Sequence, residues 1–337
     1  MKIIFFGTPE FAVPTLSSLL SHPEFEVVAV VTQPDKRRGR GNKLMPSPVK
    51  MAALNHHLPV WQPQRIKKNA ETIAKLREAE ADVFVVVAYG QILSQAILDI
   101  PSLACVNVHG SILPKYRGAA PIQRCLYEGE KETGITTMLM DAGMDTGAML
   151  LKAFAGITLL DNADSLGDRL SEIGADLLVE TLIKLRDGKI EAVAQDETEA
   201  TYAPMIKNAE YVLDWSKSAI DLHNQVRGFY PDCTTCFRGN SLKVMATVPV
   251  DPEYWLQMPP ELRVLERDWP VLDELSGENG AVVKVVKGLG AIVQTGNGLL
   301  LLREVQLAGK KVQSGMDFAN GTRLVVGEVF GSLEVTG

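Results

Sequence analysis

The sequence predicts an α/β protein, with a doubly wound parallel sheet in the first half of the chain and a smaller β-barrel in the second. Two observations carry this prediction. In the first half, apolar strands without polar alternation recur between helical segments, and such strands belong to parallel sheets that helices cover on both faces. After Ala209, short valine- and leucine-rich runs alternate with Gly and Asn turns, which is typical of a small antiparallel barrel.

The first half begins with an apolar run at 3–6, followed by the turn Gly7-Thr8-Pro9 and a helical segment at 11–20. This turn lacks the G-x-G-x-x-G spacing that lets a backbone approach a pyrophosphate, so we do not expect an NAD-dependent enzyme. The alternation that follows predicts a Rossmann-like doubly wound sheet. The further elements expected here are strands at 26–31, 83–87, 105–108 and 135–140 and helices at 71–80 and 165–186.

The second half begins after a polar stretch, Lys189 to Lys207, that has little periodicity. We therefore expect a catalytic domain at 1–189, a linker at 190–208 and a C-terminal β-barrel domain at 209–337. Residues 251–278 interrupt the barrel with eight acids and two arginines, and we expect a surface excursion there. The barrel elements expected are a helix at 218–227 and strands at 242–248, 281–286, 291–295, 299–305 and 324–326.

Composition narrows the class of protein. Hydrophobic residues make up 46% of the 337 residues, and no apolar stretch is long enough to cross a bilayer. The N-terminus has no apolar segment followed by a small-residue cleavage site, so we expect a cytoplasmic protein. Of the four cysteines, Cys233 and Cys236 form one C-x-x-C without a second pair of ligands, so we expect neither a metal site nor a disulfide. We also expect a monomer without a membrane partner.

Charge is distributed unevenly along the chain. The net charge of −7 argues against a general nucleic-acid binder. Residues 35–50 nevertheless carry six basic side chains and one acid, and screening limits repulsion from the rest of the protein to roughly 10 Å. A basic loop of this kind serves phosphates or another anionic ligand. The basic residues that we expect to contact an anion are Arg37, Arg38, Arg40 and Lys43.

Three polar residues follow or end predicted strands. Asn107 and His109 lie at the carboxyl end of a predicted central strand, the edge at which open α/β sheets bind ligands. Period-two alternation places both side chains on one side of that strand. Asp145 lies in a Gly-flanked loop after the predicted strand at 135–140. A lone Asn or His in a strand is usually structural, but this combination favours a catalytic cleft.

An amide, an imidazole and a carboxylate suit acyl transfer to an amine. Asn107 can donate a hydrogen bond to the oxyanion of a tetrahedral intermediate, and His109 can either do the same or take the amine proton. Asp145 can orient His109 or relay a proton through water. No G-x-S-x-G elbow or cysteine nucleophile signature occurs, so a covalent enzyme intermediate is not required.

The segment N-V-H-G-S-I-L-P-K-Y-R-G-A-A-P, which starts at Asn107, and the segment D-A-G-M-D-T-G, which starts at Asp141, resemble the folate-dependent formyltransferases. The resemblance implies a formyltransferase fold, a C-terminal domain like an oligonucleotide-binding barrel, and 10-formyltetrahydrofolate as the formyl donor. It also implies that Asn107, His109 and Asp145 are the catalytic residues. The residues that it places at the folate are Ser111, Ile112, Leu113, Pro114, Tyr89, Gly90, Ile92 and Asp141.

Members of this family differ in the acceptor of the formyl group. The segment Thr32 to Lys50 resembles the loop that tRNA-specific members place against the acceptor stem, with Arg40 in its R-G-R-G-x-K core, which implies initiator methionyl-tRNA as the acceptor. A nucleotide-sugar formyltransferase with the same folate site is the alternative, and a folate- or RNA-binding protein without catalysis is a further one. The sequence departs from the family at 229–234 and in the length of its acidic insertion.

Overall fold

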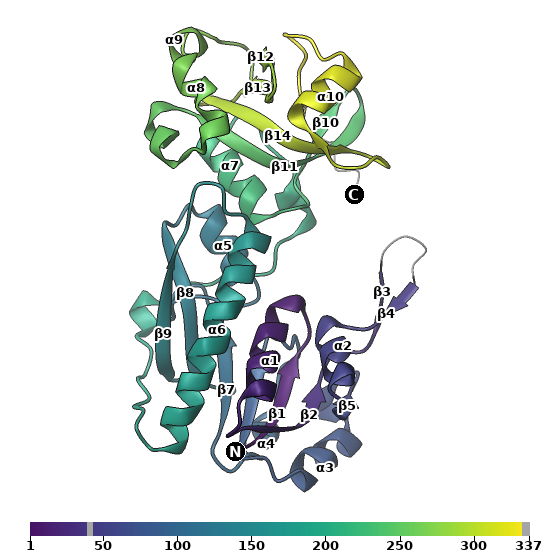
Figure 1. Cartoon of the computed structure of the whole chain (residues 1–337), viewed down its shortest axis with the longest axis vertical. Coiled ribbons are helices and arrows are strands. Elements are labelled where there is room, and N and C mark those ends of the chain that lie inside the picture. Colours follow the sequence, from purple (N-terminus) through teal and green to yellow (C-terminus); the bar gives the residue numbers. More distant parts are fainter. Residues whose placement is uncertain (39–42, 332–337) are drawn as a thin grey trace. The chain divides into compact units, whose positions relative to one another are not determined.

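A computed structural model describes residues 1–38 and 43–331 of the chain. The chain forms two compact units, which Figure 1 presents with their helices and strands labelled. Neither unit is a single continuous segment. The first comprises Met1–Pro121, Glu132–Ala155 and Gly167–Pro204, and the second comprises Ile122–Lys131, Gly156–Leu166 and Met205–Gly337.

The first unit is built on a seven-stranded sheet with the strand order β5-β2-β1-β6-β7-β8-β9. The pairs β2–β1, β1–β6 and β6–β7 are parallel, as predicted, and β5, which was not predicted, pairs parallel to β2. All five residues of β6 are buried, which accounts for its uninterrupted apolar sequence. The strands are β1 (Lys2–Gly7), β2 (Glu26–Val31), β5 (Val60–Trp61), β6 (Val83–Val87), β7 (Ala104–His109), β8 (Glu132–Leu139) and β9 (Met149–Gly156).

The prediction of a parallel sheet is wrong for β8, which runs antiparallel to β7. The loop 110–120 and α5 (Pro121–Tyr127) connect β7 to β8. The next strand starts beside His109, which pairs with Thr136, and runs back along β7. As a result, the loop that follows β8 begins next to Cys105, whose carbonyl accepts a hydrogen bond from Met140 N at 2.9 Å.

Helices and short 3₁₀ turns connect these strands (Figure 1). Ser47 and Asn69 cap two of the helices by accepting hydrogen bonds from backbone N–H groups of the first turn. The long helix α6 buries the leucine stripe that predicted it, including Leu166, Leu170 and Leu182. The helices are α1 (Val13–Ser21), α2 (Pro48–Asn55), α3 (Ala70–Glu78), α4 (Gln95–Leu98) and α6 (Ala163–Arg186), and the 3₁₀ turns are η1 (Glu10–Ala12), η2 (Ile66–Lys68) and η3 (Glu197–Glu199).

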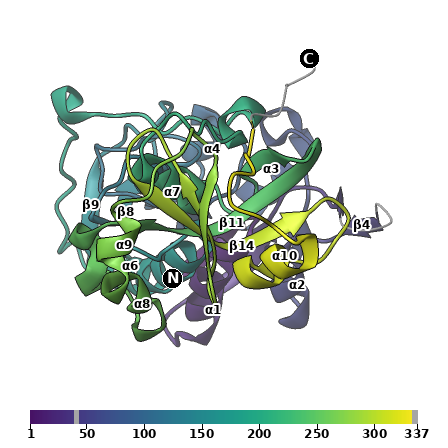
Figure 2. The ribbon, with the colours of Figure 1, turned by 90° about the horizontal axis from the view of Figure 1, so that it is seen from above.

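The second unit is built on an antiparallel sheet with the order β10-β11-β14-β13-β12, with β15 pairing to β14. Figure 2 shows its long strands β11 and β14 side by side, with α10 next to β14. Trp215, Phe237, Phe318 and Phe330 pack in its core. The elements are η4 (Asn208–Tyr211), α7 (Ala219–Gly228), β10 (Thr234–Phe237), β11 (Asn240–Val250), β12 (Val282–Val286), β13 (Gly290–Gln294), β14 (Leu299–Leu307), β15 (Gln313–Ser314) and α10 (Gly315–Thr322).

The strand predicted at 324–326 is wrong. Helix α10 ends at Arg323 in the left-handed conformation, with φ 51°, and the next residues form a turn in which Leu324 is buried and Val325 and Val326 are exposed. The hydrophobic run therefore anchors a loop through one side chain. Three residues between a left-handed cap and Gly327 are too few for a strand of ordinary length.

The acidic insertion is folded against the second unit. It forms η5 (Pro252–Gln257), η6 (Pro260–Leu262), α8 (Val264–Arg267) and α9 (Trp269–Leu272). Leu262, Leu265 and Leu272 are buried in a core that also contains residues of β11, β13 and β14. The expectation of a surface excursion is therefore wrong for these three leucines, which η6, α8 and α9 present to the sheet, whereas Leu256 of η5 is fully exposed.

The basic stretch at 35–50 contains two short strands. Strands β3 (Lys36–Arg38) and β4 (Lys43–Met45) pair antiparallel and form a separate two-stranded sheet. None of the four cysteines, all of which lie in the part of the chain that the structure describes, forms a disulfide. Burial raises the pKa of Cys105 to about 12, so this thiol is unreactive near neutral pH. No helix in the described ranges has the length and apolar character needed to cross a membrane.

Candidate active site

The carboxyl end of β7 presents two of the predicted catalytic side chains. Asn107 and His109 are two residues apart on a regular strand that pairs with β6 on one side and β8 on the other. Their side chains therefore leave the strand on the same face. His109 is 5% exposed, whereas Asn107 is partly exposed. The strand thus holds the imidazole in place and leaves the amide open to a ligand.

Asp145 joins these two residues from the loop between β8 and β9. Its Oδ1 accepts a hydrogen bond of 3.4 Å from Asn107 Nδ2, and its Oδ2 lies 3.7 Å from His109 Nδ1. The backbone N–H of Gly118 donates to Oδ2 at 2.8 Å. The predicted convergence of an amide, an imidazole and a carboxylate is therefore confirmed, while the catalytic role of each remains a prediction.

The ring of His109 lies between two oxygen acceptors. Its Nε2 is 2.9 Å from the carbonyl oxygen of Tyr116. A carbonyl oxygen can only accept, so in this orientation Nε2 carries a proton and the lone pair of the neutral ring is on Nδ1, facing Asp145. A proton taken up at Nδ1 would therefore be held next to the carboxylate.

The backbone around the site is strained at two points. Asp145 and Tyr116 both have left-handed backbone conformations, with φ 56° and 60°. Residues other than glycine adopt this region at a cost, and such strain persists where surrounding contacts hold it. Asp145 supplies the carboxylate of the site, and Tyr116 supplies the carbonyl oxygen that accepts from His109 Nε2. Gly118, with φ 123°, has space for no side chain, because a Cβ would lie 2.8 Å from the carbonyl oxygen of Ala203.

The loop after β7 contains the residues that the resemblance places at the folate. Thr136 Oγ1 of β8 donates to the carbonyl of Ser111 at 2.7 Å and accepts from Leu113 N at 3.0 Å. Lys152 Nζ of β9 donates to the carbonyl of Leu113 at 2.6 Å. Ser111 and Leu113 are fully buried, so they shape the loop from within, while Ile112 and Pro114 are less buried.

The other four predicted folate residues lie in two loops. Tyr89 is 1% exposed and its ring packs against Phe6, so its side chain belongs to the core. Its carbonyl accepts from Thr8 Oγ1, and the Gly90 carbonyl accepts from a glutamine side chain. Ile92 is 69% exposed and is the side chain of this loop most open to a ligand. Asp141 binds Gly143 N and Thr146 Oγ1 and so closes the turn that leads to Asp145.

The predicted basic loop is described only in part. Arg37 and Lys43 are exposed on the β3–β4 hairpin, and Arg38 pairs with Lys43 in its register. Arg40 lies outside the described residues.

Sequence reasoning missed three residues that bind one another and the loop of Asp145, namely Arg117, Gln195 and Glu197. Arg117 is fully buried, and its guanidinium binds Glu197 through two hydrogen bonds of 2.8 and 2.9 Å and Gln195 through Nε at 2.9 Å. Gln195 in turn donates to the carbonyl oxygens of Asp145 and Gly147, both at 2.8 Å. Arg117 lies inside the motif that starts at Asn107, which was a signal for it, but the stretch that contains the other two has no periodicity.

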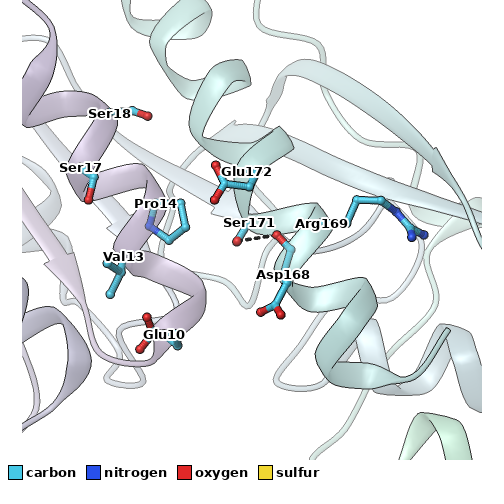
Figure 3. A pocket seen from close by; sticks show the side chains of 9 residues that line it. All are labelled: Glu10, Val13, Pro14, Ser17, Ser18, Asp168, Arg169, Ser171 and Glu172. Carbon is cyan, nitrogen blue, oxygen red and sulfur yellow. Dashed lines mark hydrogen bonds between the residues drawn. The ribbon is translucent and has the colours of Figure 1, made fainter.

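A hollow in the first unit lies between η1–α1 and α6, away from the residues described above (Figure 3). Its lining combines carboxylates and hydroxyls with one guanidinium, that of Arg169. The single hydrogen bond drawn there joins Ser171 Oγ to the carbonyl of Asp168, within one turn of α6. None of the predicted catalytic residues lines it.

Comparison with known proteins identifies the family. The model described as Formyl transferase matches residues 1–182, and the one described as Formyl transferase, C-terminal domain, matches residues 205–323. The methionyl-tRNA formyltransferase of Trichodesmium erythraeum is 68% identical over 329 residues, which cover 98% of each chain. That of Trichormus variabilis is 67% identical over 332 residues, which cover 98% of this chain and 99% of the relative.

Solved structures agree on the fold. An N-formyltransferase from Helicobacter canadensis, in complex with folinic acid and dTDP-3-aminofucose, has a TM-score of 0.62 at 19% identity and covers 90% of this chain and 98% of its own. HypX from Aquifex aeolicus in complex with tetrahydrofolic acid has a TM-score of 0.61 at 13% identity and covers 97% of this chain and 48% of its own. The predicted formyltransferase fold with a C-terminal antiparallel domain is confirmed, and the chain belongs to the methionyl-tRNA formyltransferase family.

Proposed function

We propose that this protein transfers the formyl group of 10-formyltetrahydrofolate to the amino group of methionyl initiator tRNA, and that it does so in the cytoplasm. The observation that carries the proposal is the meeting of Asn107 and His109 at one carboxylate, that of Asp145, at 3.4 and 3.7 Å. Close relatives over nearly the whole chain bear the name of this activity, which supports the acceptor. The product, formylmethionyl-tRNA, is the substrate of translation initiation.

Each of the three residues has a task in this transfer. The amine attacks the formyl carbon, and the carbonyl oxygen becomes an oxyanion that Asn107 Nδ2 stabilises by donating a hydrogen bond. His109 takes the proton that the amine loses, and Asp145 holds the resulting positive charge. The intermediate then breaks its bond to N10 of the folate, which regains a proton from His109. Bonds and protons balance without a covalent intermediate on the enzyme.

The residues near the site fit a folate. A pterin has a flat face and an edge of amide-like donors and acceptors, so it suits a site with exposed apolar side chains and main-chain groups. Ile92 is 69% exposed and Met144, one residue before Asp145, is 61% exposed. Exposed large apolar side chains are expected where a ligand covers them. The folate supplies the activated formyl group, and the loop that Thr136 and Lys152 fix would orient it.

The assay that tests this function offers two acceptors. With 10-formyltetrahydrofolate as donor, we expect formylation of methionyl initiator tRNA and none of an amino-sugar nucleotide. The sugar-modifying protein of similar fold is only 19% identical, which is why we favour tRNA. Formylation of the sugar alone would replace the proposed acceptor, and binding of both substrates without turnover would point to a binding protein. Elongator methionyl-tRNA is the matched control for initiator specificity.

The basic hairpin gives a second prediction. Replacing Arg37 and Lys43 together with alanine should raise the KM for methionyl-tRNA about 10-fold, because fewer cations then face the phosphates, which weakens binding and lessens its dependence on salt. The KM for the folate should stay within about twofold of its original value. Initial rates at two salt concentrations measure both effects. An equal loss of affinity for the two substrates would instead place the hairpin at the carboxylates of the folate.

A further inference from the structure

A single side chain ties the stretch after α6 to the loop that carries Asp145. The carboxamide of Gln195 donates from Nε2 to two carbonyl oxygens, those of Asp145 and Gly147, each at 2.8 Å. Its Oε1 accepts from Arg117 Nε at 2.9 Å. Arginine can only donate, so it fixes which end of the amide is the oxygen and turns the NH₂ group toward the loop.

This contact falls where the loop needs support. Asp145 has a left-handed backbone conformation, which costs free energy in a residue other than glycine and which the surrounding contacts offset. The N–H of Gly118 donates to the carboxylate of Asp145, and Gln195 Nε2 donates to the backbone carbonyl oxygen of Asp145. Both the side chain and the backbone of Asp145 are therefore held. Gly147 is required for the same turn, because a Cβ there would meet the carbonyl oxygen of Leu139.

The stretch 195–203, which we call the support segment, is itself hydrogen-bonded to the loop 110–120, which follows His109. Arg117 N donates to the Thr201 carbonyl at 2.8 Å, and Ala203 N donates to the Arg117 carbonyl at 2.7 Å. Tyr116 N donates to Thr201 Oγ1 at 2.9 Å, and the carbonyl of Tyr116 is the one that accepts from His109. The support segment therefore contacts both the loop whose Tyr116 carbonyl binds the imidazole and the loop that carries the carboxylate.

The ion pair beside Gln195 holds the segment in register. Arg117 is fully buried and Glu197 binds it with both carboxylate oxygens. The Glu197 side chain is 68% exposed, so the pair lies at the surface edge of the segment, and the two-fold hydrogen bonding fixes its geometry. Gln195 is two residues from Glu197 and is thereby placed at Arg117 Nε.

We propose that Gln195, oriented by Arg117, is a positioning residue that holds the catalytic loop so that Asp145 faces His109 and Asn107. The inference rests on the proposed function, since it takes Asp145 as the carboxylate of the transfer. Gln195 touches the backbone of the loop and none of the three predicted catalytic side chains, so it acts on the reaction through the place of Asp145.

Two substitutions test this role. Gln195→Glu keeps the size of the side chain but turns a carboxylate toward two carbonyl oxygens, and Gln195→Met removes all three hydrogen bonds. Both should lower kcat about 10- to 100-fold while the KM values for folate and methionyl-tRNA stay within about twofold, because a displacement of roughly 1 Å in a catalytic group costs up to about 100-fold. Glu199→Ala, an exposed change in the same segment, should leave kcat unchanged.

A double-variant comparison separates positioning from general structural support. In the Asp145→Ala background, Gln195→Met should lower the residual rate by less than about twofold, since residues that act through one another are not additive. A full 10- to 100-fold further loss there, or a kcat in both single variants equal to that of the unmodified chain, would overturn the assignment. Absence of formyl transfer by the unmodified chain would overturn the proposed function, and with it this role of Gln195.

Discussion

Asp145→Asn should lower kcat about 10²- to 10³-fold, the loss that follows removal of one preorganised electrostatic group. The aspartate accepts at both oxygens, from Gly118 N and from Asn107 Nδ2. An asparagine has one acceptor oxygen, so one of these donors would face an NH₂ group. The substitution also removes the negative charge that holds the proton on His109 during transfer.

The kinetic pattern matters as much as the size of the loss. Because Asp145 acts on charge that develops during the reaction, kcat and kcat/KM should fall together, with KM almost unchanged. Single-turnover formylation at saturating folate and methionyl-tRNA measures this directly. Asp187→Asn is a matched control, since Asp187 is exposed and paired with Arg186 at the end of α6. A variant at 145 that kept kcat within about twofold would remove the carboxylate from the mechanism.

The sequence predicted the parts of this site that depend on local pattern. Uninterrupted apolar runs predicted β1, β2 and β6, and two-residue alternation placed Asn107 and His109 on one face of β7, as the structure has them. Asp145 was found through glycines that mark a turn and through resemblance to a family. These are short-range signals, and each is written in fewer than ten consecutive residues.

Long-range hydrogen bonding left no comparable signal. Gln195 lies 50 residues from Asp145 along the chain, and nothing around it is periodic, because a side chain that binds carbonyl oxygens needs no apolar neighbours. The direction of β8 was missed for a related reason. An apolar strand has the same composition whichever way it runs, and only the path of the preceding loop decides it.

The second large effect concerns stability at acid pH. His223 of α7 is 2% exposed, with Nδ1 at 2.9 Å from Thr247 Oγ1 and Nε2 at 2.8 Å from the Leu159 carbonyl. Burial, and then the charge of Arg227, lower the pKa of His223 from 6.5 to about 3. The ring is therefore neutral in the folded protein at physiological pH.

The sign of the effect follows from proton binding. Between the folded pKa of about 3 and the unfolded value of 6.5, the unfolded chain binds a proton at His223 that the folded chain does not. The contribution to stability is therefore complete above about pH 6.5 and is lost as the pH falls toward 3. Each pH unit in this range removes about 1 kcal/mol, so the free energy of unfolding should fall by about 2–3 kcal/mol between pH 7 and 4.5.

His223→Gln separates this loss from the titration of carboxylates. A glutamine can still donate to the Leu159 carbonyl and accept from Thr247, yet it carries no charge at either pH. The variant should be about 1 kcal/mol less stable at pH 7 and should equal or exceed the unmodified chain at pH 4.5. Urea unfolding followed by tryptophan fluorescence in a Trp61→Phe background reports on this unit, because the other three tryptophans, buried Trp215 among them, belong to it. His56→Gln, at an exposed histidine, should leave the slope with pH unchanged, and the same slope in His223→Gln would mean that the buried ring does not set it.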